Sequence, residues 1–118
     1  MRTNPKKAAT PDAQREGEAE RVLKCVAPGE HLVLLCERGR EVSSEGVAKL
    51  IASAGDAGKP GLVFALGGPF GHGDAVRGRA DDAVCLSKLV MNHAVARVVL
   101  LEQLYRAFTI LRGEPYHH

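Results

Sequence analysis

Apolar residues occur in short runs that are separated by polar or glycine-rich stretches. Residues 31–36, 62–66 and 83–87 form three such runs, each bounded by turn-forming residues. Runs of this length and composition are typical of strands buried inside a sheet. Helical patterns lie between them. This order of elements predicts an α/β fold with a parallel sheet, in which ligand sites gather at the carboxyl ends of the strands.

Two helices precede the second strand. The first is predicted over residues 11–24, because Thr10 supplies a capping hydroxyl and a proline and an acid follow in the first turn. The second begins at Ser43 or Ser44 and ends before the glycine-rich turn that follows it. Residues 37–40, with the sequence Glu-Arg-Gly-Arg, are expected to form the exit loop of the first strand.

The last third of the chain contains a short helix predicted at residues 74–81, a loop at 88–93 and the longest helix at 94–111. This last helix carries apolar residues nearly all round. Such a helix needs cover on more than one side, and in a small domain a second copy of the chain is the expected cover. Residues 1–10 are polar and aperiodic, so they are expected to form a flexible N-terminus ahead of one domain at residues 11–118.

Composition restricts the possible functions. The chain has 118 residues, 45% of them hydrophobic and 25% charged, which is ordinary for one globular domain. Its 16 basic and 14 acidic side chains leave a net charge of +2, too small for binding nucleic acid by bulk charge. The three cysteines form no CxxC pair, and no apolar run is long enough to span a membrane.

Several features could carry chemistry. The glycine-rich turn at residues 67–73 follows a strand and precedes a helix, yet it lacks both phosphate-binding patterns, so it is either a ligand site or a tight turn. The five histidines lack the spacing of a metal site, and no metal is expected. The tail at residues 112–118 combines Arg, Tyr and His, which could stack on a base or move a proton, although a disordered end is the more usual fate.

Three segments stand in a distinctive order: LGGPFG at residues 66–71, LSKLVMNH at residues 86–93 and RVVLLEQLYRAFTILRGEPYHH at residues 97–118. Together they resemble the ribosomal RNA large subunit methyltransferase H family, which belongs to the SPOUT class. The resemblance extends from about residue 31 to the end. The dipeptide Asn92-His93 and the final Tyr116-His117-His118 resemble the plant organelle branch of the family. It implies a parallel sheet with a C-terminal trefoil knot.

The resemblance also implies a cofactor and its site. SPOUT enzymes bind S-adenosylmethionine among three loops that follow strands. Transferred by position, the residues expected to line this site are Leu35, Gly67, Leu86, Ser87, Lys88, Leu89, Val90 and Met91. The glycine would let the backbone approach the cofactor, and the apolar side chains would enclose the adenine ring.

The implied reaction is methylation of N3 of a pseudouridine in large-subunit rRNA of the assembled ribosome. The family acts as a homodimer in which the tail of one subunit completes the site of the other. Protein groups must align the reactants and help the imide nitrogen to lose its proton. The candidates for these roles are His93, Arg97, Tyr116, His117 and His118, with Arg97 or Arg106 the better suited to bind a phosphate or to stabilise an anion.

Family members begin with a strand and a helix that have no counterpart ahead of Thr10, so the chain is expected to be a fragment, a short isoform or a mis-started gene product. The alternative to an active enzyme is a catalytically inactive RNA-binding or dimerisation remnant of the same fold. A plant source implies a chloroplast or mitochondrion, and any other source implies the bacterial cytoplasm. No membrane association is expected.

Overall fold

A computed structural model describes residues 10–67 and 71–118. The expected flexible N-terminus at residues 1–10 lies outside the described residues except for Thr10, as do positions 68–70 of the glycine-rich turn. Strands and helices alternate along the chain. They are α1 (Pro11–Lys24), β1 (His31–Glu41), α2 (Ser44–Asp56), β2 (Leu62–Leu66), α3 (Asp74–Arg79), β3 (Asp82–Cys85) and α4 (His93–Arg112).

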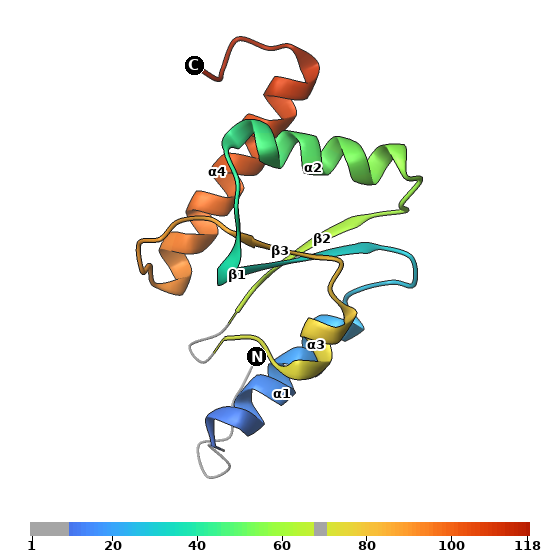
Figure 1. Cartoon of the computed structure of the whole chain (residues 1–118), viewed down its shortest axis with the longest axis vertical. Coiled ribbons are helices and arrows are strands. Elements are labelled where there is room, and N and C mark those ends of the chain that lie inside the picture. Colours follow the sequence, from blue (N-terminus) through green and yellow to red (C-terminus); the bar gives the residue numbers. More distant parts are fainter. Residues whose placement is uncertain (1–9, 68–70) are drawn as a thin grey trace.

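The described strands form a parallel sheet with the order β2-β1-β3. The central strand β1 is the most buried of the three. Helices α2 and α4 lie on one side of the sheet, and α1 and α3 lie on the other (Figure 1). The predicted α/β fold with a parallel sheet is therefore confirmed, as three layers.

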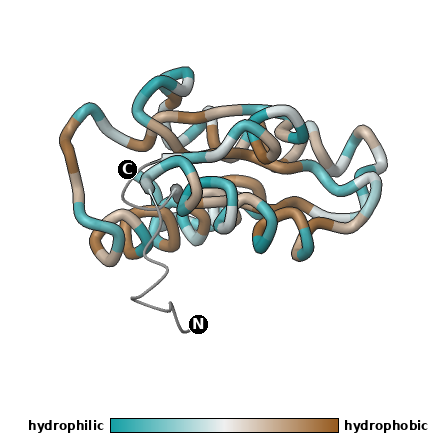
Figure 2. The backbone as a smooth tube through the Cα atoms, turned by 90° about the horizontal axis from the view of Figure 1, so that it is seen from below, coloured by the Kyte–Doolittle hydropathy of each residue, from teal (hydrophilic) through white to brown (hydrophobic). Residues whose placement is uncertain are grey.

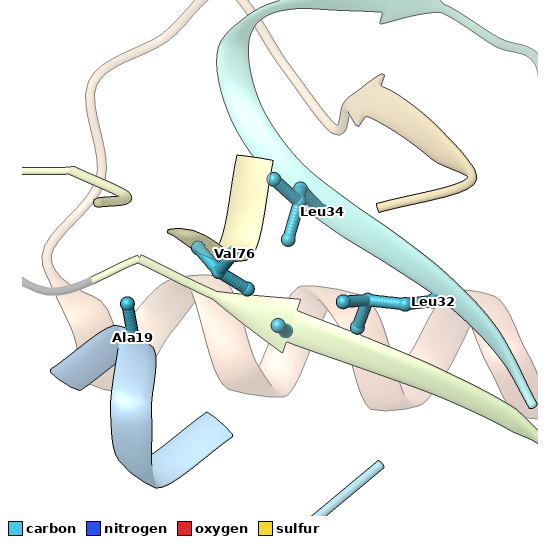
Figure 3. Packing of buried hydrophobic residues seen from close by; sticks show 5 residues of the cluster. Ala19, Leu32, Leu34 and Val76 are labelled. Carbon is cyan, nitrogen blue, oxygen red and sulfur yellow. The ribbon is translucent and has the colours of Figure 1, made fainter. Parts of the chain in front are cut away.

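One face of the sheet packs against α1 and α3. Leu32 and Leu34 of β1 project from the same side of the strand and pack with Ala19 of α1 and Val76 of α3, as Figure 3 shows. All four side chains are at most 2% exposed, so this layer is closed. Period-two alternation along β1 therefore directs every second side chain to this face.

The opposite face packs against α2 and α4. Val33 and Leu35 of β1 pack with Leu50 of α2 and Leu100 of α4. A further cluster between the two helices contains the fully buried Ala107. In Figure 2 hydrophobic residues run along the strands in the middle of the molecule and recur along the helices, as expected for a sheet buried on both faces.

Strand β1 is longer than predicted, and the prediction of an exit loop at residues 37–40 is wrong. The strand continues to Glu41 through an irregularity in which Leu35 and then Arg40 both pair with Val84 of β3. The Arg40 guanidinium donates two hydrogen bonds to the Asp82 carboxylate, at 3.2 and 2.7 Å. Pairing with β3 and this ion pair hold a polar, glycine-containing segment in extended form.

The helix starts follow from capping side chains. The Thr10 hydroxyl accepts a hydrogen bond from the Ala13 amide at 3.3 Å, and the Ser43 hydroxyl accepts one from the Gly46 amide at 3.0 Å. Each bond satisfies an amide that the helix itself leaves free. Both predicted caps are therefore confirmed, with Ser43 rather than Ser44 in the second case. Among the described residues, no helix is long and apolar enough to cross a membrane.

Candidate functional site

A large cleft lies where β2 and β3 end and where β1 shifts register after Leu35. Its volume is about 1120 Å³. Leu35 of β1, Leu66 at the end of β2 and Leu86 just after β3 all line it. Because parallel strands end at the same edge of a sheet, residues far apart in sequence meet here.

Most of the residues predicted to bind a cofactor lie on this cleft. The cleft is lined by the two predicted residues from β1 and the turn after β2, and by all but one of the predicted residues in the loop at 86–91. These residues are Leu35, Gly67, Leu86, Ser87, Leu89, Val90 and Met91. The exception is Lys88. Its ammonium group pairs with the Glu41 carboxylate at 3.0 Å, and its side chain is 82% exposed.

The loop after β3 is held by its own polar groups. The Ser87 hydroxyl accepts a hydrogen bond from the Leu89 amide at 3.0 Å, and the Ser87 carbonyl accepts one from the Cys85 thiol at 3.2 Å. The apolar side chains beyond this point project outward, with Leu89 77% and Val90 85% exposed. The loop thus presents two large apolar side chains beside a fixed backbone.

His72 is a cleft residue that sequence reasoning missed. Its side chain is 7% exposed, and its Nε2 atom lies 3.0 Å from the carbonyl oxygen of Leu35. Burial lowers the pKa of this imidazole, and the positive charge of Arg77 lowers it further, while the bond to Leu35 acts in the opposite direction. A single histidine in a glycine-rich turn carries no spacing signal that could have identified it.

The candidate catalytic residues fall into two separate places. His93 lines the cleft at the first turn of α4, whose start is capped by the Asn92 side chain through a 2.9 Å bond from the Val95 amide. Arg97 is exposed one turn further on and does not line the cleft. Tyr116 and His117 lie beside Arg106 near the other end of α4, about 20 Å along the helix from His93.

The tail is held against the rest of its own chain by a polar network. The Tyr116 hydroxyl donates to the Glu102 carboxylate at 3.0 Å, and Arg106 donates to the same carboxylate at 2.9 Å. The imidazole of His117 bridges two side chains. Its Nδ1 atom lies 3.0 Å from the Arg106 guanidinium, and its Nε2 atom contacts the carboxylate of Glu45 at the start of α2.

The hydrogen bonds of this network lower the pKa of two carboxyls, those of Glu102 and Glu45. The hydrogen bond from Arg106, followed by that from Tyr116, lowers the pKa of Glu102, and the bond from His117 lowers that of Glu45. The ring of Tyr116 also stacks edge-on against Tyr105, with centroids 4.8 Å apart. The exposed His118 has no part in these interactions among the described residues. Tyr116 and His117 therefore lie together, away from the cleft.

The described residues were also compared with the requirements of a metal site. Across residues 10–67 and 71–118, no group of three or more His, Cys, Asp or Glu side chains is placed to hold a metal ion. The cleft instead combines an apolar wall and a histidine at a helix start with charged side chains, among them Arg38 and Asp74. This lining suits an organic ligand that carries both a flat ring and charged groups.

The class of protein defined by this α/β fold and cleft is identified by comparison with protein families. Residues 1–117 match the family model described as "Predicted SPOUT methyltransferase". The match covers nearly the whole chain, and the chain belongs to the SPOUT methyltransferase family.

Individual relatives show which members of this family the chain is similar to. A protein of Arabidopsis thaliana, whose name describes an RNA methyltransferase, is 45% identical over all 118 residues, which span 61% of its length. Proteins named Ribosomal RNA large subunit methyltransferase H from Geotalea daltonii and Geobacter metallireducens are 46% and 47% identical over 112 residues. These alignments cover 95% of this chain and 73% of each bacterial protein. The resemblance found in the sequence is thereby confirmed.

Proposed function

We propose that this protein transfers a methyl group from S-adenosylmethionine to N3 of a pseudouridine in large-subunit rRNA. The observation that carries the proposal is that Leu35 of β1, Leu66 at the end of β2 and Leu86 just after β3 meet on a cleft of about 1120 Å³. A cleft of this size has room for a nucleoside cofactor and for part of a nucleotide substrate. Relatives named as rRNA methyltransferases supply the substrate class.

The residues of the cleft fit this cofactor. An added β-carbon at Gly67 would lie 3.3 Å from both the Nε2 atom of His72 and the carbonyl carbon of Gly71, so a side chain there would crowd the turn. The backbone of the loop at residues 86–91 would bind the polar edge of the adenine, and Leu89 and Val90 would cover its faces. When bound, the sulfonium compound supplies an activated methyl group.

The protein must then manage the proton of the imide nitrogen. In this proposal the imidazole of His93 accepts that proton. The N-terminal end of α4, where Asn92 and His93 line the cleft, carries a partial positive charge that stabilises the anion formed on the ring. Arg97, one turn further along, binds a phosphate of the RNA.

The second copy in the proposed homodimer packs on the exposed face of α4. Six large apolar side chains recur there at intervals of three or four residues, and each is 44% or more exposed; they are Val95, Val98, Leu101, Tyr105, Phe108 and Leu111. Such a stripe along 20 residues of helix is typical of an interface between subunits. Tyr116 stacks on Tyr105 at its edge, so the tail continues the same surface.

The dimer explains why the tail lies far from the cleft of its own subunit. In the proposal Tyr116, His117 and His118 reach the cleft of the partner, where they help to bind RNA and to remove the proton. The domain spans residues 11–118, and its C-terminal part is threaded as a trefoil knot. The compartment is an organelle in a plant and the cytoplasm in a bacterium, in keeping with relatives from Arabidopsis and from bacteria.

Methyl transfer to ribosomes that lack the modification separates this proposal from an inactive RNA-binding remnant. Labelled methyl groups should appear in large-subunit rRNA with the wild-type chain, and His93→Ala should reduce the rate at least tenfold. An inactive remnant would bind the ribosome without any incorporation. Mass spectrometry of the digested rRNA locates the methyl group, and a label at any atom other than N3 of a pseudouridine would contradict the proposed target.

A further inference from the structure

His72 joins two of the three segments that form the cleft. It belongs to the turn after β2, whereas its hydrogen-bond partner, the carbonyl of Leu35, belongs to β1, 37 positions earlier in the chain. The side chain is 7% exposed and lines the cleft. A buried hydrogen bond therefore ties the wall of the cleft formed by the turn to the wall formed by β1.

The chemistry of this bond fixes which ring nitrogen carries the hydrogen. A carbonyl oxygen can only accept, so the Nε2 atom of His72 must donate to Leu35. Burial favours the neutral ring, as does the positive charge of Arg77. The opposing charge is Glu18 of α1. The ring is therefore a neutral donor in a defined orientation.

Other contacts hold the turn around His72. An added β-carbon on Gly73 would lie 2.7 Å from the Arg15 carbonyl oxygen of α1, which shows how closely that helix packs on the turn. The Arg77 guanidinium donates to the His72 carbonyl at 3.3 Å. On the cleft side, Gly67 lies against the imidazole, because an added β-carbon there would be 3.3 Å from Nε2. The imidazole thus supports Gly67 from behind.

We propose that His72 is a positioning residue for the cofactor: its Nε2–H···O=C bond to Leu35 sets the distance between Gly67 and the middle of β1, and so the width of the cleft where the cofactor binds. The inference rests on the proposed use of this cleft for S-adenosylmethionine. His72 acts through Gly67 and Leu35 and need not touch the cofactor itself.

Two amide variants that differ in reach test this role. The side-chain amide of His72→Gln can extend to the Leu35 carbonyl as Nε2 does, whereas that of His72→Asn is shorter by one methylene group. Affinity for S-adenosylmethionine, measured by calorimetry on the 118-residue chain, should fall roughly tenfold in His72→Asn and less than threefold in His72→Gln, as expected for the loss and the rescue of one buried hydrogen bond. Amide exchange at Gly67 should become faster in the same order.

A control separates positioning from general stability. Val47→Ala removes buried volume between α2 and α4 at a residue that does not line the cleft, and it should lower the melting temperature while leaving cofactor affinity within twofold. Equal affinities for His72→Asn and His72→Gln would overturn the inference. If the wild-type chain itself binds no S-adenosylmethionine, the proposed function fails, and the exchange rates at Gly67 still decide whether His72 holds the turn.

Discussion

Gly39 crosses the backbone of Val84 so closely that a β-carbon on Gly39 would lie 2.5 Å from the Val84 carbonyl carbon and 2.6 Å from its nitrogen. Both contacts are with main-chain atoms, which cannot rotate away as a side chain can. The crossing occurs where β1 shifts register, between the pairing of Leu35 and that of Arg40 with the same Val84. A glycine is therefore required where the end of β1 passes over β3.

Replacing this glycine should be costly. Gly39→Ala should lower the free energy of unfolding by about 2–4 kcal/mol, because the added methyl group forces the two strands apart. Urea denaturation followed by circular dichroism measures the change. Gly55→Ala is the matched control, since nothing lies within 4 Å of an added β-carbon in that part of α2, and it should stabilise by about 0.5–1 kcal/mol. Equal effects of the two substitutions would contradict the requirement.

This crossing also shows what sequence could not predict. The continuous apolar run predicted the buried part of β1, because residues 32–35 pack against helices on both sides of the sheet. The continuation to Glu41 is polar and contains a glycine, which by itself favours a loop. Its extended form comes from pairing with β3, more than 40 residues later, and from the Arg40–Asp82 ion pair. Pairing between distant segments leaves no local pattern to read.

The candidate site, like the fold, could be predicted only in part. The family resemblance predicted cleft residues such as Leu35, Gly67 and Met91, because they lie in or after strands whose order is visible in the sequence. It could not locate His72, which becomes significant only through its bond to Leu35. Nor could spacing along the chain show that Tyr116 folds back to Glu102, 14 residues earlier.

His72 should make stability depend on pH. Its pKa in the folded chain is lowered from the ordinary value of 6.5, so between these two values the unfolded chain binds more protons than the folded one. The free energy of unfolding should therefore fall as pH drops below about 6.5, until the folded pKa is reached. Urea unfolding at several pH values between 7.5 and 5 measures the slope.

The variant His72→Gln should flatten this slope, since it removes the titrating group and retains a donor to Leu35. The lowered pKa values of Asp81 and Asp82 do not contribute here, because their ordinary value is 3.8 and their stabilisation is lost only at lower pH. An identical slope in the wild type and in His72→Gln would show that His72 does not titrate as described.

The tail network should matter for methyl transfer and not for cofactor binding. Glu102→Gln weakens the bonds to Tyr116 and Arg106, so the tail loses its fixed position. We expect the rate of methyl transfer to fall roughly ten- to a hundredfold, a range typical of a misplaced reacting group, with cofactor affinity within twofold. Glu114→Gln is the control, because that carboxylate contacts only the exposed Arg112, at 3.6 Å, among the described residues. A loss of cofactor affinity in Glu102→Gln would contradict the separation of the two places.

The exposed face of α4 should hold two copies together. Sedimentation should give twice the chain mass of 12.6 kDa for the wild type. Leu101→Asp places a charge in the centre of the apolar stripe and should raise the dissociation constant at least about tenfold. The control Ser53→Asp adds the same charge on an exposed part of α2 and should leave the dimer intact. A dimer unaffected by Leu101→Asp would assign the interface to another surface.

The measurement that tests the central claim most directly is calorimetric titration of the 118-residue chain with S-adenosylmethionine. The convergence of Leu35 of β1 with the ends of β2 and β3 on the cleft predicts one binding site per chain. Gly67→Val should weaken this binding strongly, because a branched side chain would crowd His72 and Gly71, which lie 3.3 Å from an added β-carbon. The absence of binding by the folded wild-type chain, or equal binding by Gly67→Val, would contradict the claim that this cleft holds the cofactor.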